Sequence, residues 1–122
     1  MKKRDSVSVF KNALRGCLYA FSTQPNFLIH FSISVLVVIL ASWLQIPFER
    51  FLLLVLIIIF GLTIEMANTA LKAVVDLVTL RFHPRAKIAK DVAAGMMLLA
   101  AFGAAILGTL ILLPPLWEKI LR

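Results

Sequence analysis

Three long apolar segments follow one another along the chain, and each is long enough to cross a lipid bilayer. They cover residues 27–44, 51–71 and 92–116, and Glu65 is the only formally charged residue in them. A helix needs about 20 mainly apolar residues to span the hydrocarbon core. The pattern therefore predicts an all-α membrane protein with three transmembrane helices in a single domain, residues 1–122.

Residues 7–22 have a different pattern, in which apolar positions recur with the period of a helix. The opposite face of that helix is polar and carries Arg15. This pattern favours an amphipathic surface helix with its basic side toward anionic headgroups; the alternative is a basic leader to the first span. Pro25 then interrupts the helix. The apolar face consists of Val7, Phe10, Leu14, Cys17, Leu18 and Phe21.

Prolines and a tryptophan indicate where the spans end. Trp43 stands near the end of the first span, at a position typical of a membrane interface. Residues 77–91 are predicted to form a cytoplasmic loop with a turn at Pro84. The Pro114-Pro115 pair is expected to close the third span.

The composition supports a membrane protein and argues against nucleic acid as the partner. Hydrophobic residues make up 61% of the chain and the mean hydropathy is +0.98, above the apolar content of a soluble domain. The net charge of +7 would be compatible with nucleic-acid binding, but the basic residues are separated by the spans. The single cysteine, Cys17, excludes an internal disulfide.

The distribution of lysine and arginine predicts the orientation in the membrane. Ten of them precede the first span or lie between the second and the third: Lys2, Lys3, Arg4, Lys11, Arg15, Lys72, Arg81, Arg85, Lys87 and Lys90. Only three fall on the other side: Arg50, Lys119 and Arg122. Cytoplasmic segments carry the excess of positive charge. We therefore expect a multi-pass membrane protein with a cytoplasmic N-terminus and an external C-terminus.

The second span ends in a polar face. Glu65, Asn68, Lys72 and Asp76 are spaced i, i+3, i+7 and i+11, which places them on one side of a helix. If the span starts at Phe51, Glu65 lies roughly 21 Å from the outer surface, still beneath the inner headgroups. A charged carboxylate at that depth should face protein or a wet cavity. Another copy of the chain is expected to help enclose it.

This polar face can be interpreted in three ways. It can serve only to hydrogen-bond neighbouring helices. It can also catalyse phosphoryl transfer, since a lipid hydroxyl lies at the depth of Glu65 and a nucleotide approaches from the cytosol. A transporter or channel is disfavoured, because the polar face stops partway through the bilayer and the third span continues it only at Thr109.

Several motifs resemble the bacterial integral-membrane lipid kinases, the diacylglycerol kinases and undecaprenol kinases. The pattern E-x-x-N-[ST]-A is present as Glu65, Asn68, Thr69 and Ala70, and A-K-D as residues 89–91. The segments FHPRAKIAKD and TQPNFLIH are also similar to family segments. The resemblance covers nearly the whole chain and implies a homotrimer with active sites shared between subunits at the cytoplasmic boundary.

The resemblance also implies roles for individual residues. Glu65 matches the family's general base, and Asn68 matches its hydrogen-bonding partner. The positions that match the nucleotide site are Lys90, Asp91, Phe82, His83, Gln24 and Lys72. The implied reaction transfers the γ-phosphate of ATP to a membrane lipid alcohol, undecaprenol or diacylglycerol, with Mg²⁺ as the metal. The segment NFLIH and the cytoplasmic loop look closer to the undecaprenol kinases.

Two positions depart from the family's pattern. Gln24 and Lys72 stand where the family usually has the glutamates that hold Mg²⁺. Glutamine is a poorer ligand for a hard cation, and a protonated lysine is none. Either Lys72 contacts the phosphates directly, with Mg²⁺ held by Glu65, Asp76 or ATP, or the chain is a degenerate homologue with weak or no activity. His30 is expected to form an interhelical hydrogen bond.

Overall fold

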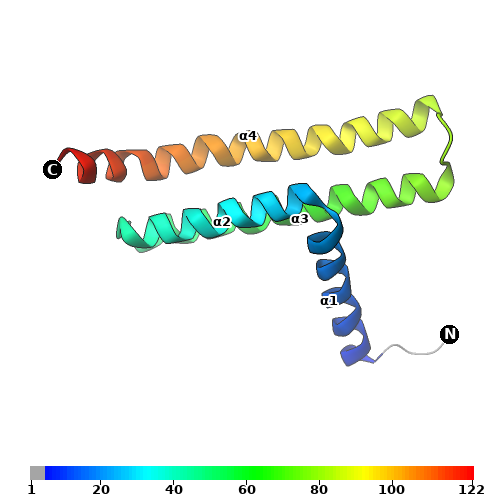
Figure 1. Ribbon diagram of the computed structural model, residues 1–122, viewed down its shortest axis with the longest axis horizontal. Coiled ribbons are helices and arrows are strands. Elements are labelled where there is room, and N and C mark those ends of the chain that lie inside the picture. The colour runs from blue at the N-terminus through cyan, green and yellow to red at the C-terminus, as the bar shows by residue number, and fades with distance from the viewer. Residues whose placement is uncertain (1–4) are drawn as a thin grey trace.

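The computed structural model describes residues 5–122, and these form four helices joined by short connections (Figure 1). Lys2, Lys3 and Arg4, which contribute to the charge asymmetry, lie outside the described residues. Three helices run side by side, whereas the first projects away from them (Figure 1). The helices are α1 (Ser6–Thr23), α2 (Pro25–Trp43), α3 (Phe48–Val78) and α4 (Pro84–Leu121).

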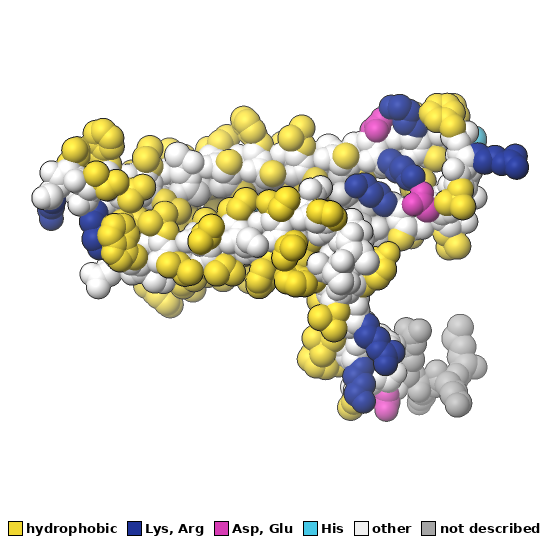
Figure 2. Space-filling view, viewed as in Figure 1, with side chains coloured by type: hydrophobic (Ala, Val, Ile, Leu, Met, Phe, Trp, Pro, Cys, Tyr) yellow, Lys and Arg dark blue, Asp and Glu magenta, His cyan; other side chains and the backbone are white. Residues whose placement is uncertain are grey.

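Helices α2, α3 and α4 have the length and apolar composition needed to cross a membrane. Figure 2 shows apolar side chains along most of their length, with charged side chains gathered at the α3–α4 connection and on α1. Helix α3 has 31 residues and is therefore roughly 46 Å long, about 16 Å longer than the hydrocarbon core is thick. The predicted all-helical class with three apolar spans is confirmed.

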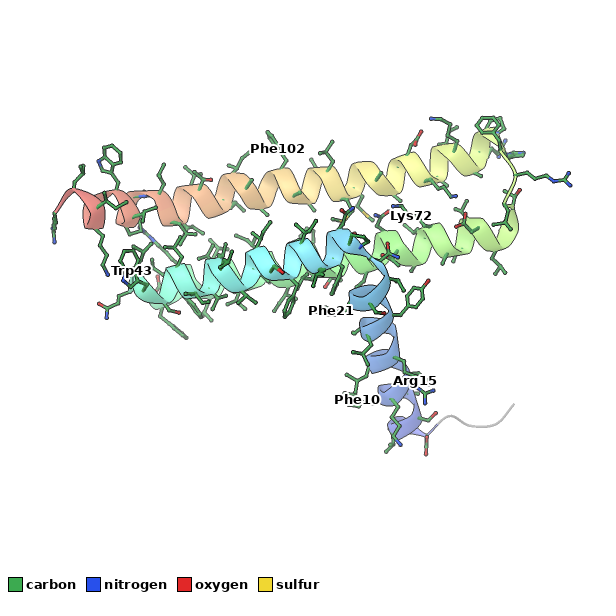
Figure 3. The ribbon with its side chains drawn as sticks, in the orientation of Figure 1. Phe10, Arg15, Phe21, Trp43, Lys72 and Phe102 are labelled. Atoms are coloured by element: carbon green, nitrogen blue, oxygen red, sulfur yellow. The ribbon has the colours of Figure 1, made fainter. Side chains whose placement is uncertain are left out.

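Helix α1 matches the segment expected to lie in the membrane interface. Phe10 and Arg15 lie on opposite sides of it (Figure 3). At its end the ring of Phe21 packs edge-on against Phe27 and Phe31 of α2, with centroids 6.3 and 5.5 Å apart. These contacts hold α1 against the start of α2 and leave most of its apolar face exposed, as an interfacial helix requires.

The connection between α3 and α4 is shorter than the loop expected over residues 77–91. Helix α3 continues to Val78, and α4 already begins at Pro84. Proline is favoured at the first position of a helix, because the missing N–H is unsatisfied there in any case. His83 precedes it as the N-cap, and its Nδ1 accepts a hydrogen bond from the Arg85 N–H at 3.1 Å. Most of the expected loop is therefore the first two turns of α4.

The Pro114-Pro115 pair does not end the last helix, which continues to Leu121. Each proline removes one backbone hydrogen bond, but its φ angle is still compatible with a helix. The turns that follow are held against α2 by Lys119. Its Nζ donates to the Trp43 carbonyl at 2.8 Å and lies 4.2 Å from the centre of the Trp43 ring. This contact satisfies one of the free carbonyls at the end of α2.

The buried core lies at this end of the bundle, near the turn between α2 and α3. Leu54 of α3 and Ile111 and Leu112 of α4 pack with Ala41 and Leu44 at the end of α2. Toward the α3–α4 connection the bundle opens, and the polar face of α3 borders a cavity there. The core thus fixes the three helices at one end and leaves space between them at the other.

The turn between α2 and α3 contains the one residue other than glycine with a positive φ in the described chain, Gln45 at 51°. This left-handed conformation follows the end of α2. There the Ile46 N–H donates a hydrogen bond to the Ala41 carbonyl, with N and O 3.5 Å apart. This conformation is about 1–2 kcal/mol less stable for a residue with a Cβ, whereas glycine adopts it without that cost.

We therefore expect Gln45→Gly to raise the apparent melting temperature of the purified protein, with a gain of about 0.5–1 kcal/mol in the free energy of unfolding. The matched variant Gln45→Val should lower it, because a branched side chain is strained at positive φ. Thermal unfolding in detergent measures both. A lower melting temperature for Gln45→Gly would contradict this assignment.

Candidate active site

Glu65 is the one charged side chain that is buried among residues 5–122. It is 4% exposed, as is Asn68, which lies one turn further along the same face of α3. The spacing of three residues places both on the inward side of the helix, as the sequence predicted. A carboxylate at this depth is stable only when it faces the interior of the protein or a wet space.

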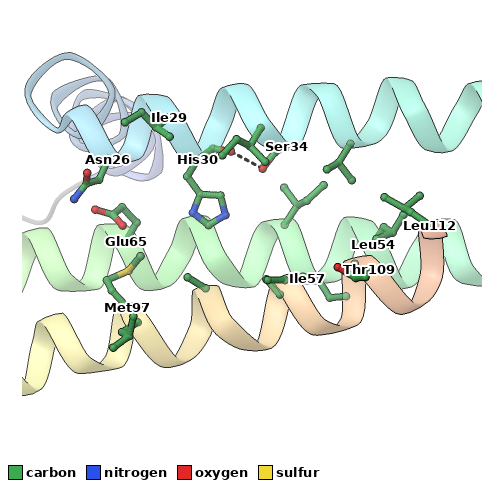
Figure 4. Close-up of a pocket in the computed structure, with 18 of the residues that line it drawn as sticks. Asn26, Ile29, His30, Ser34, Leu54, Ile57, Glu65, Met97, Thr109 and Leu112 are labelled. Atoms are coloured by element: carbon green, nitrogen blue, oxygen red, sulfur yellow. Dashed lines mark hydrogen bonds between the residues drawn. The ribbon is translucent and has the colours of Figure 1, made fainter. Parts of the chain in front are cut away.

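Both side chains line a cavity of about 800 Å³ between α2, α3 and α4 (Figure 4). Polar residues gather in the part nearest the α3–α4 connection: Asn26 and His30 from α2, and Glu65, Asn68 and Lys72 from α3. The remainder is mainly apolar, with Ser34 and Thr109 in its wall, and runs along α4, past Ala104 and Gly108, to the buried core. The cavity therefore combines a short polar head with a long apolar channel.

The polar groups at the head of the cavity lack partners within the described part of the chain. The Oδ1 atom of Asn68 is buried and accepts no hydrogen bond. No hydrogen bond or ion pair within residues 5–122 involves the Glu65 carboxylate. Leaving a buried acceptor unsatisfied costs roughly 1–3 kcal/mol. A water molecule, an ion or a ligand in the cavity can supply the hydrogen bonds that the protein does not.

The end of the site nearest the α3–α4 connection is held by an ion pair between two helices. Lys90 Nζ of α4 lies 2.6 Å from Asp76 Oδ1 of α3. Lys90 is thus placed beside the last residue of the polar face, at the mouth above Lys72. The pair is exposed and stabilises the fold by at most about 1 kcal/mol, so its main effect is to orient the two side chains. Figure 3 shows Lys72 on the side of α3 that faces α4.

The other candidate residues lie further from the cavity. Asp91 forms an ion pair with Lys87 on α4, with Nζ and Oδ2 2.6 Å apart. Phe82 and His83 are exposed in the α3–α4 connection. Gln24 lies at the junction of α1 and α2, where its Nε2 donates to Thr23 Oγ1 at 3.2 Å. A single chain therefore brings together Glu65, Asn68 and Lys72, with the Lys90–Asp76 pair next to them.

Two residues that were not expected in the site border the same cavity: Asn26 and His30 of α2. No hydrogen bond of the His30 imidazole occurs within the described residues, so the expected interhelical bond is not found. Its ring instead lies over Gly61, one turn before Glu65. The sequence feature that could have indicated this contact is Gly61, four residues before the buried Glu65. A glycine at such a position leaves room for a side chain from the neighbouring helix.

The side chains present do not make a site for a divalent metal ion. No group of three histidine, cysteine, aspartate or glutamate side chains is close enough to hold one within the described residues. Asp76 and Asp91 are each paired with a lysine. Lys72 occupies the cavity wall where the resemblance implies a metal-binding glutamate, and it contributes positive charge instead of a ligand. The donor set therefore does not fit protein-held Mg²⁺ at positions 24 and 72.

Sequence comparison places this chain among known proteins. The sequence profile of the prokaryotic diacylglycerol kinase family matches residues 11–112. A protein named diacylglycerol kinase from Synechocystis sp. is 47% identical over 108 residues, which make up 88% of this chain and 62% of that protein. A protein named undecaprenol kinase from Bacillus subtilis is 36% identical over 107 residues, or 88% of this chain and 87% of that protein.

The chain thus spans less than two thirds of the Synechocystis relative and most of the Bacillus relative. The identity is higher with the protein named diacylglycerol kinase than with the one named undecaprenol kinase. The similarity of NFLIH and the cytoplasmic loop to undecaprenol kinases therefore does not determine which lipid is the substrate. Because the family profile covers most of the chain and both relatives match 88% of it, the chain belongs to the prokaryotic diacylglycerol kinase family.

Proposed function

We propose that this protein is a lipid kinase that transfers the γ-phosphate of ATP to the hydroxyl of a membrane lipid alcohol, diacylglycerol or undecaprenol. The observation that carries the proposal is the unpartnered pair of Glu65 and Asn68, which is buried at the polar head of a long apolar cavity. A lipid alcohol has the matching shape, since one polar group ends an apolar chain. The names of the two relatives support the same class of substrate.

The depth of Glu65 supports a membrane-embedded acceptor. It lies 17 residues after the start of α3 at Phe48, or roughly 26 Å along the helix. A hydrocarbon core about 30 Å thick places its carboxylate just beneath the inner polar region, where a lipid hydroxyl resides. Lys72 and Lys90 lie further along, on the side from which a nucleotide arrives. The two substrates would meet at this boundary.

In this reaction Glu65 acts as the general base. It takes the proton of the lipid hydroxyl while the hydroxyl oxygen forms a bond to the γ-phosphorus, and the bond from that phosphorus to the leaving ADP oxygen breaks. Asn68 provides a hydrogen bond that orients the reacting groups. Lys72 and Lys90 offset the negative charge of the phosphates, and Asp76 holds Lys90 in place. Asp91, Phe82, His83 and Gln24 belong to the outer part of the nucleotide site.

The assembly that we propose is a homotrimer in the bacterial cell membrane. Helices α2 and α4 flank α3 but leave the cavity open between them, so one chain does not enclose its own polar head. A neighbouring copy would close the site and bring its own α3–α4 connection and α1 near the nucleotide.

One observation favours a second candidate, a homologue that retains the fold with weak or no catalysis. Gln24 and Lys72 offer an amide oxygen and an ammonium instead of two carboxylates, although phosphoryl transfer generally uses a metal ion to neutralise charge. In the active enzyme that we propose, the fixed ammonium of Lys72 neutralises part of the phosphate charge.

The first prediction concerns the base. Glu65→Gln keeps the size and hydrogen-bonding capacity of the side chain but removes its ability to accept a proton, so we expect the turnover number to fall about 10²–10⁴-fold. The assay is transfer of labelled γ-phosphate to dioctanoylglycerol and to undecaprenol in lipid nanodiscs. Glu49→Gln, at the exposed opposite end of α3, is the matched control and should retain full activity. Equal turnover in Glu65→Gln and the unmodified protein would exclude the proposed base.

The second prediction concerns Lys72. If its ammonium contacts a phosphate, Lys72→Met should raise the KM for ATP about tenfold and leave the KM for the lipid unchanged, because a hydrogen bond to a charged group contributes about 1.5–3 kcal/mol. A Gln24→Glu, Lys72→Glu double variant separates the two candidate functions. Activity that appears only in the double variant would show that the natural chain has lost catalysis.

The third prediction concerns orientation. In a Cys17→Ser background, Glu49→Cys should react with a membrane-impermeant maleimide in intact cells, because Glu49 stands at the outer end of α3. Arg81→Cys, in the α3–α4 connection, should react only after the membrane is permeabilised. The reverse labelling pattern would place the proposed nucleotide site outside the cell and exclude an ATP-dependent reaction there.

A further inference from the structure

The imidazole of His30 is held in an unusual position for a membrane helix, directly on the backbone of the neighbouring helix. A Cβ added to Gly61 of α3 would lie 2.8 Å from Nε2 of His30 and closer still to Cε1. Gly61 is buried, and the other described glycines have no such neighbour within 4 Å. The absence of a side chain at position 61 is therefore what allows the ring to enter the space between α2 and α3.

His30 and Glu65 project into the same part of the cavity, from opposite walls. Figure 4 shows the ring reaching from α2 toward α3 and the Glu65 carboxylate beside it, on the side of Asn26. No ion pair or hydrogen bond joins the two within the described residues. Ser34, one turn further along α2, directs its hydroxyl proton to the His30 carbonyl, with Oγ 2.8 Å from that oxygen.

These polar groups line the same space without bonding one another. The imidazole nitrogens, the Glu65 carboxylate and Asn68 Oδ1 all face a space in which the protein offers them no partner. A ring nitrogen of neutral histidine donates one hydrogen bond, and a carboxylate only accepts. A water molecule or the hydroxyl of an alcohol can accept a hydrogen bond from the first and donate one to the second.

We propose that His30, seated on Gly61, and Glu65 form a subsite that binds the hydroxyl of the lipid alcohol between them. The alcohol oxygen accepts a hydrogen bond from the imidazole N–H and donates its own proton toward Glu65, which leaves one lone pair free. That lone pair forms the bond to the γ-phosphorus, while the proton passes to Glu65 and ADP leaves. This subsite rests on the proposed lipid kinase function. It adds His30 to the residues of that site, as the group that selects and orients the hydroxyl.

Gly61 is part of the subsite although it has no side chain. An alanine there would push the ring out of the cavity, because its Cβ would collide with an atom of the imidazole rather than with open space. Substitution at position 61 should therefore have the same effect as removing the imidazole, without changing any ionisable group.

The test is a double-mutant cycle between positions 30 and 61, with the KM for dioctanoylglycerol and for farnesol measured separately from the KM for ATP. We expect His30→Ala and Gly61→Ala each to raise the KM for the alcohol at least tenfold and to leave the KM for ATP unchanged. The KM of the double variant for the alcohol should be no higher than that of either single variant. Once His30 is alanine, a Cβ at position 61 has no ring to displace. Gly95→Ala, at an exposed position with open space around it, is the control.

Two results would overturn the subsite. One is an unchanged KM for the alcohol in His30→Ala; the other is a double variant whose loss equals the product of the two single losses, which would mean that positions 30 and 61 act independently. Size-exclusion chromatography of each variant shows whether it is folded. If Gly61→Ala does not fold, the comparison of the unmodified protein with His30→Ala still decides the question.

A binding measurement separates this inference from the kinase function. A bound ligand raises the melting temperature of the folded protein. Farnesol should stabilise the unmodified protein more than farnesyl methyl ether, which lacks the donated proton, and His30→Ala should abolish the difference. If the unmodified protein shows the difference but transfers no phosphate, the subsite stands and the kinase proposal fails. If it transfers phosphate and the alcohol and ether stabilise it equally, the kinase proposal stands and the subsite fails.

Discussion

A carboxylate inside a membrane bundle is the constraint on which the arrangement of this protein depends. An acidic side chain near the middle of a transmembrane helix costs at least about 2.5 kcal/mol, so Glu65 has to be kept away from the acyl chains. The structure does this by packing α3 against both α2 and α4 and by turning Glu65 and Asn68 into the space between them. Small residues on α4, such as Ala104 and Gly108, leave that space unfilled.

The two ends of the bundle are held by different chemistry, and this difference makes the site accessible from one side. At the end near the α2–α3 turn, an apolar core and the contact of Lys119 with Trp43 join α2 to α4. At the end near the α3–α4 connection, the link is an exposed ion pair between Lys90 and Asp76, which is weak and accessible to water. The polar head of the cavity therefore lies toward the water-accessible end, whereas the mainly apolar part runs toward the core.

Lysine at position 72 gives the polar head of the cavity a different charge from the glutamate that the resemblance implies at this position. In the proposed reaction, a glutamate would hold a metal ion, and that ion would offset the charge of the phosphates. Lys72 presents a fixed ammonium instead, and Lys90 adds a second ammonium where it pairs with Asp76, one turn further along α3. In the proposed reaction these ammonium groups would donate hydrogen bonds to the phosphates but would not bridge several oxygens as a metal ion does.

The sequence alone determined the features that follow from local periodicity and from the thickness of a bilayer. It predicted the three apolar spans, the amphipathic first helix, and the alignment of Glu65 and Asn68 on one inward face of α3, because side-chain direction within a helix depends only on spacing. Helix ends were less predictable, since Pro84 begins a helix where a loop was expected and the Pro114-Pro115 pair does not end one. The tertiary structure decided which side chains meet across helices: His30 with Gly61, Lys90 with Asp76, and Asp91 with Lys87 instead of the cavity. These contacts depend on the rotation and offset of one helix against another, which are set by the packing of whole surfaces and are not encoded in the spacing of residues within either helix.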